Sequence, residues 1–267
     1  MLVNYDVMRV LVNGLIPHDS GKTTMAISLI KALKEMGFDV GFSKPISGIN
    51  GWYQYHCIEE SIKLGFLVGE DLLKLHEACQ SDNSLIIEGA VVSVVFPPDP
   101  ERIGWRTDIY SFHVPTMMRI VEKHYIFMDQ LSILPSTLKT VIDKLIKILK
   151  PKKAYNFEKL FGMSVYLADN CLKMIDHDFI VIESYSNVSS PTLESMNVDY
   201  VLSVAPGKVA LVNGNDFRRA LEVIPSQPWN VTTESVLEIL KPMKTFEIPP
   251  KKTDEVAYDV LSFLKCD

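Results

Sequence analysis

Residues 12–26 read VNGLIPHDSGKTTMA, and this stretch decides the fold. The apolar run before it, MRVLVNG (residues 8–14), is typical of a buried parallel strand that ends at a glycine. From Lys22 onward, KTTMAISLIKALKEMG has the apolar spacing of a helix, and Gly37 predicts where that helix ends. The next run, FDVGFSKPISG (residues 38–48), predicts a second strand that ends near Lys44. The order strand, loop, helix, strand predicts an α/β fold.

The loop between the first strand and the helix carries residue types that bind phosphate. Gly21 lets the backbone approach an anion closely, Lys22 supplies a cation, and Thr23 offers a hydroxyl to Mg²⁺. Their neighbours Ser20 and Thr24 are expected to contact the same ligand. GKTT alone is a weak match, but a preceding strand and a following amphipathic helix form the context that such a motif requires. The alternative is a glycine turn before an ordinary helix.

The opening of this loop departs from the common phosphate-binding pattern. Ile16 stands where the common loop has its first glycine, and Gly14 lies further back. Pro17 stands where ATP-dependent partitioning switches carry an extra lysine, which disfavours that class. Asp19 is a candidate catalytic residue that could bind Mg²⁺ through water or orient an attacking group, and an acid that merely caps the helix is the alternative.

The set-back glycine, Asp19 and the strand ending in KPISG (residues 44–48) together resemble the dethiobiotin synthetase family, whose patterns read G-T-D-T-D/E-V-G-K-T and K-P-V-x-S-G. The resemblance covers the first fifth of the chain. It implies that Lys22 and Thr23 serve ATP and Mg²⁺, and that Lys44 faces the substrate or the γ-phosphate. Because that family is dimeric, the resemblance also suggests a homodimer.

The combination of GLIPHDSGKTT, KPISGINGWYQY and VIESYSN is similar to a group of uncharacterised archaeal proteins described as predicted P-loop ATPases or GTPases. This second resemblance adds little chemistry beyond nucleotide binding.

An acid for the metal is expected after a later strand. HDFIVIESYSN (residues 177–187) contains an apolar strand followed by Glu183, as a Mg²⁺ site beside a phosphate loop requires. Glu183 matches the glutamate of the dethiobiotin synthetase pattern V-E-G-A-G-G. The following residues, Ser184 to Asn187, replace the glycines of that family, which puts the same diamino substrate in doubt. The alternative for Glu183 is an exposed charge at a strand end.

Between about residues 50 and 160 the pattern changes, and we expect an inserted mixed α/β segment within a single domain of residues 1–267. ESIKLGFLVGEDLLKLHEAC (60–79) looks helical, whereas SLIIEGAVVSVVFPPDPERIGW (84–105), IYSFHV (109–114) and HYIFMDQ (124–130) look like strands. After residue 161 strands and helices alternate again. The whole pattern predicts a three-layer P-loop sandwich with a mostly parallel sheet.

Some side chains near the predicted site remain open between two roles. The aromatic residues Trp52, Tyr53 and Tyr55 follow the strand that carries Lys44, and they suit substrate recognition and internal packing equally well. Arg102 and Arg106 could each contact a phosphate or carboxylate, and an ordinary surface arginine is the alternative for both.

Composition excludes several classes of protein. The 27 basic and 33 acidic residues give a net charge of −6, which opposes non-specific binding to nucleic acid. The four cysteines lack any C-x-x-C spacing, which argues against a disulfide framework or a zinc site. No apolar run reaches the length of a membrane span, and no signal peptide is recognisable. We therefore expect a cytoplasmic protein without a membrane partner.

These features predict Mg²⁺-dependent nucleotide binding with hydrolysis or phosphoryl transfer. Three classes remain: an enzyme that activates a carboxyl or carbamate group of a small substrate, a regulatory ATPase or GTPase that acts with a protein partner, and a nucleotide-binding module without turnover. ATP is favoured over GTP because NGND (213–216) and NVDY (197–200) lack the lysine of the guanine-reading pattern N-K-x-D.

Overall fold

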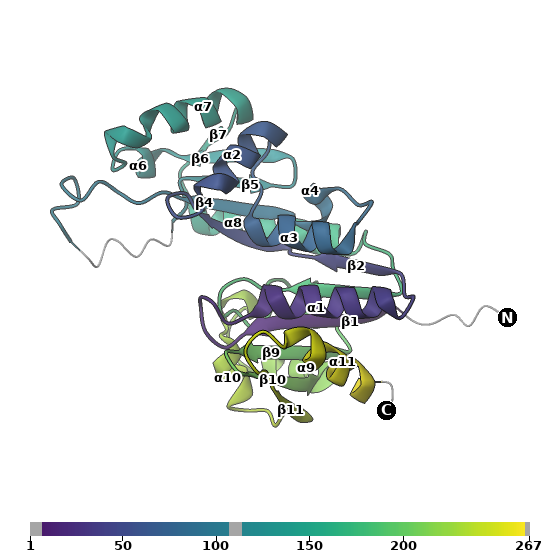
Figure 1. Cartoon of the computed structure of the whole chain (residues 1–267). Coiled ribbons are helices and arrows are strands. Elements are labelled where there is room, and N and C mark those ends of the chain that lie inside the picture. Colours follow the sequence, from purple (N-terminus) through teal and green to yellow (C-terminus); the bar gives the residue numbers. More distant parts are fainter. Residues whose placement is uncertain (1–6, 107–113, 265–267) are drawn as a thin grey trace.

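The computed structural model of the chain describes residues 7–106 and 114–264, and its strands form two sheets (Figure 1). The first, sheet A, has the order β11-β10-β9-β1-β8-β2. Its strands are β1 (Met8–Gly14), β2 (Val40–Ser43), β8 (Phe179–Glu183), β9 (Tyr200–Ala205), β10 (Lys208–Asn213) and β11 (Lys244–Glu247). The four strands β9, β1, β8 and β2 are parallel, whereas β10 and β11 pair antiparallel at one edge. The carboxyl ends of β1, β8 and β2 therefore lie at the same side of the sheet.

The second sheet, sheet B, has the order β3-β4-β5-β6-β7. Its strands are β3 (Ile46–Asn50), β4 (Val91–Val95), β5 (Met117–Ile120), β6 (Lys123–Phe127) and β7 (Lys152–Ala154). The outer pairs β3–β4 and β6–β7 are parallel, and the two inner pairings are antiparallel. The predicted strand at 109–114 lies mostly outside the described residues.

Helices cover both faces of each sheet. They are α1 (Lys22–Glu35), α2 (Tyr55–Leu64), α3 (Glu70–Cys79), α4 (Leu85–Glu88), α6 (Met128–Leu131), α7 (Lys139–Leu149), α8 (Phe157–Leu172), α9 (Gly214–Val223), α10 (Thr233–Leu237) and α11 (Thr253–Leu264). Helices α1, α3 and α11 pack on one face of sheet A, and α9, α10 and the end of α8 pack on the other. Helices α2 and α7 cover one face of sheet B, and the middle of α8 covers its other face. Helix α8 is thus shared by both sheets.

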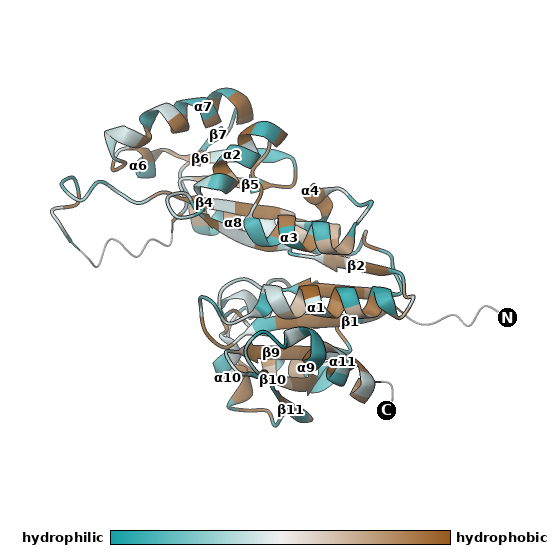
Figure 2. Ribbon diagram, in the orientation of Figure 1, coloured by the Kyte–Doolittle hydropathy of each residue, from teal (hydrophilic) through white to brown (hydrophobic). Residues whose placement is uncertain are grey.

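Hydropathy follows this layering. In Figure 2 the strands β1 and β9 are mainly hydrophobic, whereas α1 and α3 carry both hydrophobic and hydrophilic residues. This pattern is expected for a buried parallel sheet with amphipathic helices on its faces. Among residues 7–106 and 114–264, no helix combines the length and apolar character that a membrane crossing needs.

The α/β class is confirmed. Both sheets are mixed, and parallel pairings predominate in sheet A, where β9, β1, β8 and β2 run parallel. The predicted strand at 38–48 is divided between the sheets: β2 ends at Ser43 and β3 begins at Ile46. Pro45 explains the break, since it has no N–H for a strand ladder. Lys44 lies between the two strands, directly before Pro45, and donates its backbone N–H to the Glu88 carbonyl instead of to a neighbouring strand.

Two further predictions between residues 60 and 105 need correction. The helical stretch 60–79 is two helices, because the chain leaves α2 at Gly65, whose φ of 79° is left-handed. The first residues of the predicted strand at 84–105 form α4 before β4 begins at Val91. Ser84 caps α4 by accepting a hydrogen bond from the Ile86 N–H, which favours the helix locally.

The end of α4 yields a prediction about stability and pH. Glu88 is fully buried, and its Oε2 lies 2.6 Å from Nδ1 of His76. Burial raises the pKa of Glu88. The folded protein therefore favours the protonated carboxyl group: its stability is fully present below the usual glutamate pKa of about 4.3 and decreases as pH rises through the raised pKa of Glu88. We expect Glu88→Gln to be more stable than the wild type by an amount that grows as pH rises above about 4 and through the raised pKa of Glu88.

Thermal unfolding across this pH range measures the effect, and Glu77→Gln on the exposed side of α3 is the matched control. A difference between Glu88→Gln and the wild type that is constant with pH, or larger in acid, would contradict the assignment.

Candidate functional site

The loop of residues 15–21 joins the carboxyl end of β1 to the first turn of α1. Gly21 directly precedes α1 and has a φ of 93°, a left-handed conformation that glycine adopts without strain. Asp19 also has a positive φ, 53°, and its side chain is exposed. Backbone N–H groups at the first turn of a helix lack carbonyl partners within the helix, so this loop ends at a favourable place for an anion. The strand, loop and helix predicted here are confirmed as elements.

Lys22, the first residue of α1, is a largely buried cation that hydrogen-bonds to a neutral partner in the loop. Only 8% of the residue is exposed, and Nζ donates a hydrogen bond of 3.0 Å to the Ser20 hydroxyl. The side chain passes over Gly14, because a Cβ placed on that glycine would lie 2.9 Å from Lys22 Nζ. Burial, and then the charge of Lys44, lower the pKa of Lys22. An anion in the loop would relieve both effects. The set-back Gly14 therefore has a structural role, since it leaves room for the lysine.

Glu183 is the centre of a second group of contacts at the carboxyl end of β8. The residue is fully buried, so the alternative of an exposed strand-end charge is wrong. Its Oε1 accepts a hydrogen bond of 2.8 Å from the Thr23 hydroxyl and one of 2.6 Å from Lys44 Nζ. Three segments far apart in sequence thus meet: the start of α1, the end of β2 and the end of β8. The parallel pairing of β8 with both β1 and β2 places them together.

Lys44 is enclosed by oxygen atoms. Its Nζ donates to Glu183 and to the Ser184 carbonyl at 2.8 Å, and lies 3.3 Å from Oδ2 of Asp71. Burial opposes the charge of this lysine, but Glu183 and then Asp71 raise the pKa of Lys44 above its usual value. Lys44 therefore stays protonated and neutralises two acids. An ammonium group has three N–H donors, so Lys44 would have to give up one of these contacts to reach a ligand.

Asp71 was not identified from the sequence. It lies in the first turn of α3, its side chain is 43% exposed, and it approaches both Lys44 and the Thr23 hydroxyl. Burial acts against its ionisation, yet the nearby Lys44 holds the pKa of Asp71 below its usual range. The stretch 60–79 looked like one continuous helix, which hid this position. The available signal was Gly69 followed by Glu70 and Asp71, because paired acids after a glycine are typical of a helix start.

The oxygen groups of Thr23, Asp71 and Glu183 fit a hard divalent cation. Glu183 Oε2 is buried and has no hydrogen-bond partner among the described residues, so the carboxylate has a free coordination position. Burial also raises the pKa of Glu183, against the effect of Lys44, and a cation would stabilise its ionised form. Carboxylate and hydroxyl oxygens are the ligands that Mg²⁺ prefers.

The remaining predicted residues are not gathered as closely. Thr24 is exposed at the start of α1, and Asp19 acts on Lys22 only as a neighbouring charge. The aromatic residues Trp52 and Tyr53 are 54% and 84% exposed, so they do not pack the second sheet as core residues. Arg102 donates to the Ser132 carbonyl on the sheet B side of the chain, which favours a structural role.

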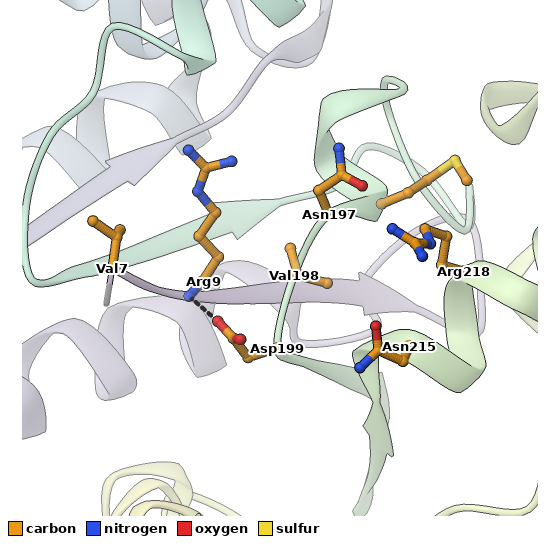
Figure 3. A pocket seen from close by; sticks show the side chains of 8 residues that line it. Val7, Arg9, Asn197, Val198, Asp199, Asn215 and Arg218 are labelled. Carbon is orange, nitrogen blue, oxygen red and sulfur yellow. Dashed lines mark hydrogen bonds between the residues drawn. The ribbon is translucent and has the colours of Figure 1, made fainter. Parts of the chain in front are cut away.

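A shallow polar pocket lies at the opposite end of β1 (Figure 3). Its volume is about 430 Å³, and Arg9, Asp199 and Arg218 are among its lining residues. It is separated from the loop by the length of β1, roughly 20 Å. Its charges already have partners: Arg9 Nη1 binds Glu194 at 2.7 Å, and the Arg9 backbone N–H donates to Asp199. This pocket therefore does not belong to the candidate site.

Neither models of known protein families nor curated protein sequences gave a match to this chain. The chemistry of the site therefore has to be inferred from its geometry.

Proposed function

We propose that the protein binds a nucleoside triphosphate, with ATP favoured over GTP, together with Mg²⁺, and transfers or hydrolyses its terminal phosphoryl group. The observation that carries this proposal is Lys22: a nearly buried ammonium group with a neutral partner, in a glycine loop that opens a helix. A phosphate supplies the missing negative charge, and helix amides supply hydrogen bonds to it.

Each residue of the site has a role in this proposal. Lys22 and the backbone of Ser20 and Gly21 hold the β- and γ-phosphates. Thr23, Asp71 and Glu183 hold Mg²⁺, which when bound neutralises charge on the phosphate oxygens.

Lys44 and Asp19 have less direct roles. Lys44 neutralises Glu183 and Asp71, and its longest contact, 3.3 Å to Asp71, is the one it would exchange for a phosphate oxygen or an acceptor. Asp19 is exposed within the loop, where it would orient an attacking group.

The phosphoryl acceptor we favour is a carboxyl or carbamate group of a small substrate. Two cations, Lys22 and Lys44, lie near the proposed phosphate position, and an anionic acceptor needs such charges to approach a triphosphate. Strand β3 begins shortly after Lys44, and the exposed Trp52 and Tyr53 follow its end. These aromatic side chains provide a surface for a second ligand. Substrate-dependent release of ADP and phosphate would support this class, whereas release that depends on a protein partner would support a regulatory ATPase.

Lys22→Ala tests the proposal directly. We expect this variant to bind Mg²⁺-ATP at least about 30-fold more weakly, since loss of one partner of a buried charge contact costs about 2 kcal/mol or more. Lys31→Ala is the matched control because Lys31 is exposed further along the same helix.

Titration of ATP and GTP by calorimetry, followed by phosphate release in the same samples, measures the outcome. Equal affinity of wild type and Lys22→Ala, or no binding of either nucleotide by the wild type, would refute nucleotide binding in this loop.

A further inference from the structure

The first turns of α2 and α3 bring together three side chains that bind transition metals. His56, Cys57 and Glu70 each offer one ligand atom, and these three atoms all lie within 4.8 Å of one another. The imidazole Nε2 of His56 is 3.5 Å from Oε2 of Glu70. Within residues 7–106 and 114–264, no other three side chains of histidine, cysteine or an acid bring their ligand atoms this close together.

These distances are close to those of a tetrahedral zinc site. With Zn–S near 2.3 Å and Zn–N or Zn–O near 2.0–2.1 Å, neighbouring ligand atoms lie roughly 3.3–3.6 Å apart. The histidine–glutamate separation already has this value. The sulfur needs to approach the other two atoms by at most about 1.3 Å, which side-chain rotation supplies.

Neighbouring groups orient the ligands. The Lys74 ammonium lies 2.6 Å from Oε1 of Glu70. The other oxygen, Oε2, faces His56 and accepts a hydrogen bond of 3.1 Å from Gln54 Nε2, which a metal ion would replace. The Glu70 backbone N–H hydrogen-bonds to the Cys57 sulfur, so the thiol already faces the start of α3. Such contacts fix metal ligands in productive orientations.

Burial differs among the three ligands in a useful way. Cys57 is fully buried, the Glu70 side chain is 29% exposed, and the His56 side chain is 55% exposed. A cation can therefore enter from the solvent side, and a fourth position remains for water or another ligand. Zinc sites with three protein ligands and one open position have this arrangement.

We propose that His56, Cys57 and Glu70 bind a single zinc ion at the starts of α2 and α3. Thiolate, imidazole and carboxylate together favour Zn²⁺ over Mg²⁺ or Ca²⁺, which select oxygen ligands. Binding displaces the proton of the Cys57 thiol to solvent, because the thiolate is the ligand. This zinc site is separate from the proposed magnesium site and does not depend on it.

The proposal revises an expectation from the sequence. The spacing of the cysteines argued against a zinc site, and that reasoning considered cysteine pairs only. Here the ligands are two adjacent residues on one helix and a glutamate on the next, a pattern that pairwise cysteine spacing does not detect.

The test uses the full-length protein, stripped of metal and free of nucleotide. Zn²⁺ is titrated in competition with a chromophoric chelator, and Co²⁺ is titrated separately to detect the thiolate-to-cobalt charge-transfer band. We expect one equivalent of Zn²⁺ per chain and a visible charge-transfer band. His56→Ala is expected to weaken binding at least about 10-fold, the smallest loss usual even for a residue that only supports a ligand. Cys57→Ser is expected to remove the band.

The controls separate this site from general effects. His18→Ala changes an exposed histidine elsewhere, and Cys171→Ser changes a buried thiol in α8; both should bind zinc as the wild type does. Lys22→Ala should also retain zinc, which makes failure of the zinc site distinguishable from failure of nucleotide binding. Because His56 is half exposed, its variant should fold even if Cys57→Ser does not. Absence of tight Zn²⁺ binding by the wild type, or unchanged affinity in His56→Ala, would overturn the proposal.

Discussion

Glu183→Gln is expected to lower Mg²⁺-dependent phosphate release roughly 100- to 1000-fold, the usual effect of removing one preorganised charge or donor from a catalytic site. The substitution keeps the size of the side chain but removes the charge that holds the proposed metal ion. It also leaves Oε1 as an acceptor for Thr23, which now donates at 2.8 Å. The loss should therefore appear in turnover and in the Mg²⁺ concentration required for turnover.

Asp71→Asn is expected to act in the same direction, because Asp71 approaches the same hydroxyl group and the same lysine. Nucleotide affinity measured without metal should change little in either variant, since Lys22 and the loop are intact. Glu77→Gln, exposed on the same helix as Asp71, is the control. Turnover in Glu183→Gln at the wild-type rate, under the same Mg²⁺ concentration, would exclude a metal-binding role for this acid.

Lys44→Met is expected to lower the thermal midpoint by roughly 6–12 °C, which corresponds to about 3 kcal/mol in a chain of this size. The cause is Glu183, which is fully buried and would lose the cation that lies 2.6 Å from its carboxylate. Removing one member of a buried ion pair leaves an uncompensated charge. Mg²⁺ should raise the midpoint of this variant more than that of the wild type, because it supplies the missing positive charge.

The double variant Lys44→Met/Glu183→Gln distinguishes this cause from a simple packing defect. If the buried charge is responsible, the double variant should recover most of the lost stability while phosphate release stays low. Thermal unfolding of the two single variants and the double variant gives the coupling between the two positions. Additive losses of stability would show that the ion pair does not determine the effect.

Local patterns predicted the parts of the fold that depend on neighbouring residues. The strand before Gly14, the helix from Lys22 and the strand before Glu183 are all confirmed. The two strands are continuous apolar runs and the helix has a periodic apolar pattern, each with a glycine or polar residue at its end, and such signals are contained within one element. Since parallel strands end at the same side of a sheet, the convergence of Lys22, Lys44 and Glu183 could also be predicted from the sequence.

Contacts between segments that are distant in sequence could not be predicted in the same way. The edge strands β10 and β11 join sheet A in antiparallel pairs. The two-residue connection Pro206–Gly207 indicates that β10 is antiparallel to β9, but no local pattern indicates that β11 pairs with β10. The pair Asn213–Gly214 is typical of a turn, but the Asn213 side chain accepts hydrogen bonds from two N–H groups and begins α9. Asp71 was missed for a related reason, since its importance comes from the packing of α3 against α1.

The crossing at Lys44 and Pro45 connects the candidate site to sheet B. Lys44 is the residue after which the chain leaves sheet A for sheet B, and its side chain is fixed by residues of the candidate site. If a ligand shifts sheet B relative to sheet A, we expect it to change the free energy of holding Lys44 beside Glu183. Thermodynamic coupling is reciprocal, so a nucleotide that changes the contacts of Lys44 must alter the affinity for that ligand by the same factor. If the site binds a nucleotide as proposed, Lys44 and Pro45 form a direct covalent connection between that site and sheet B.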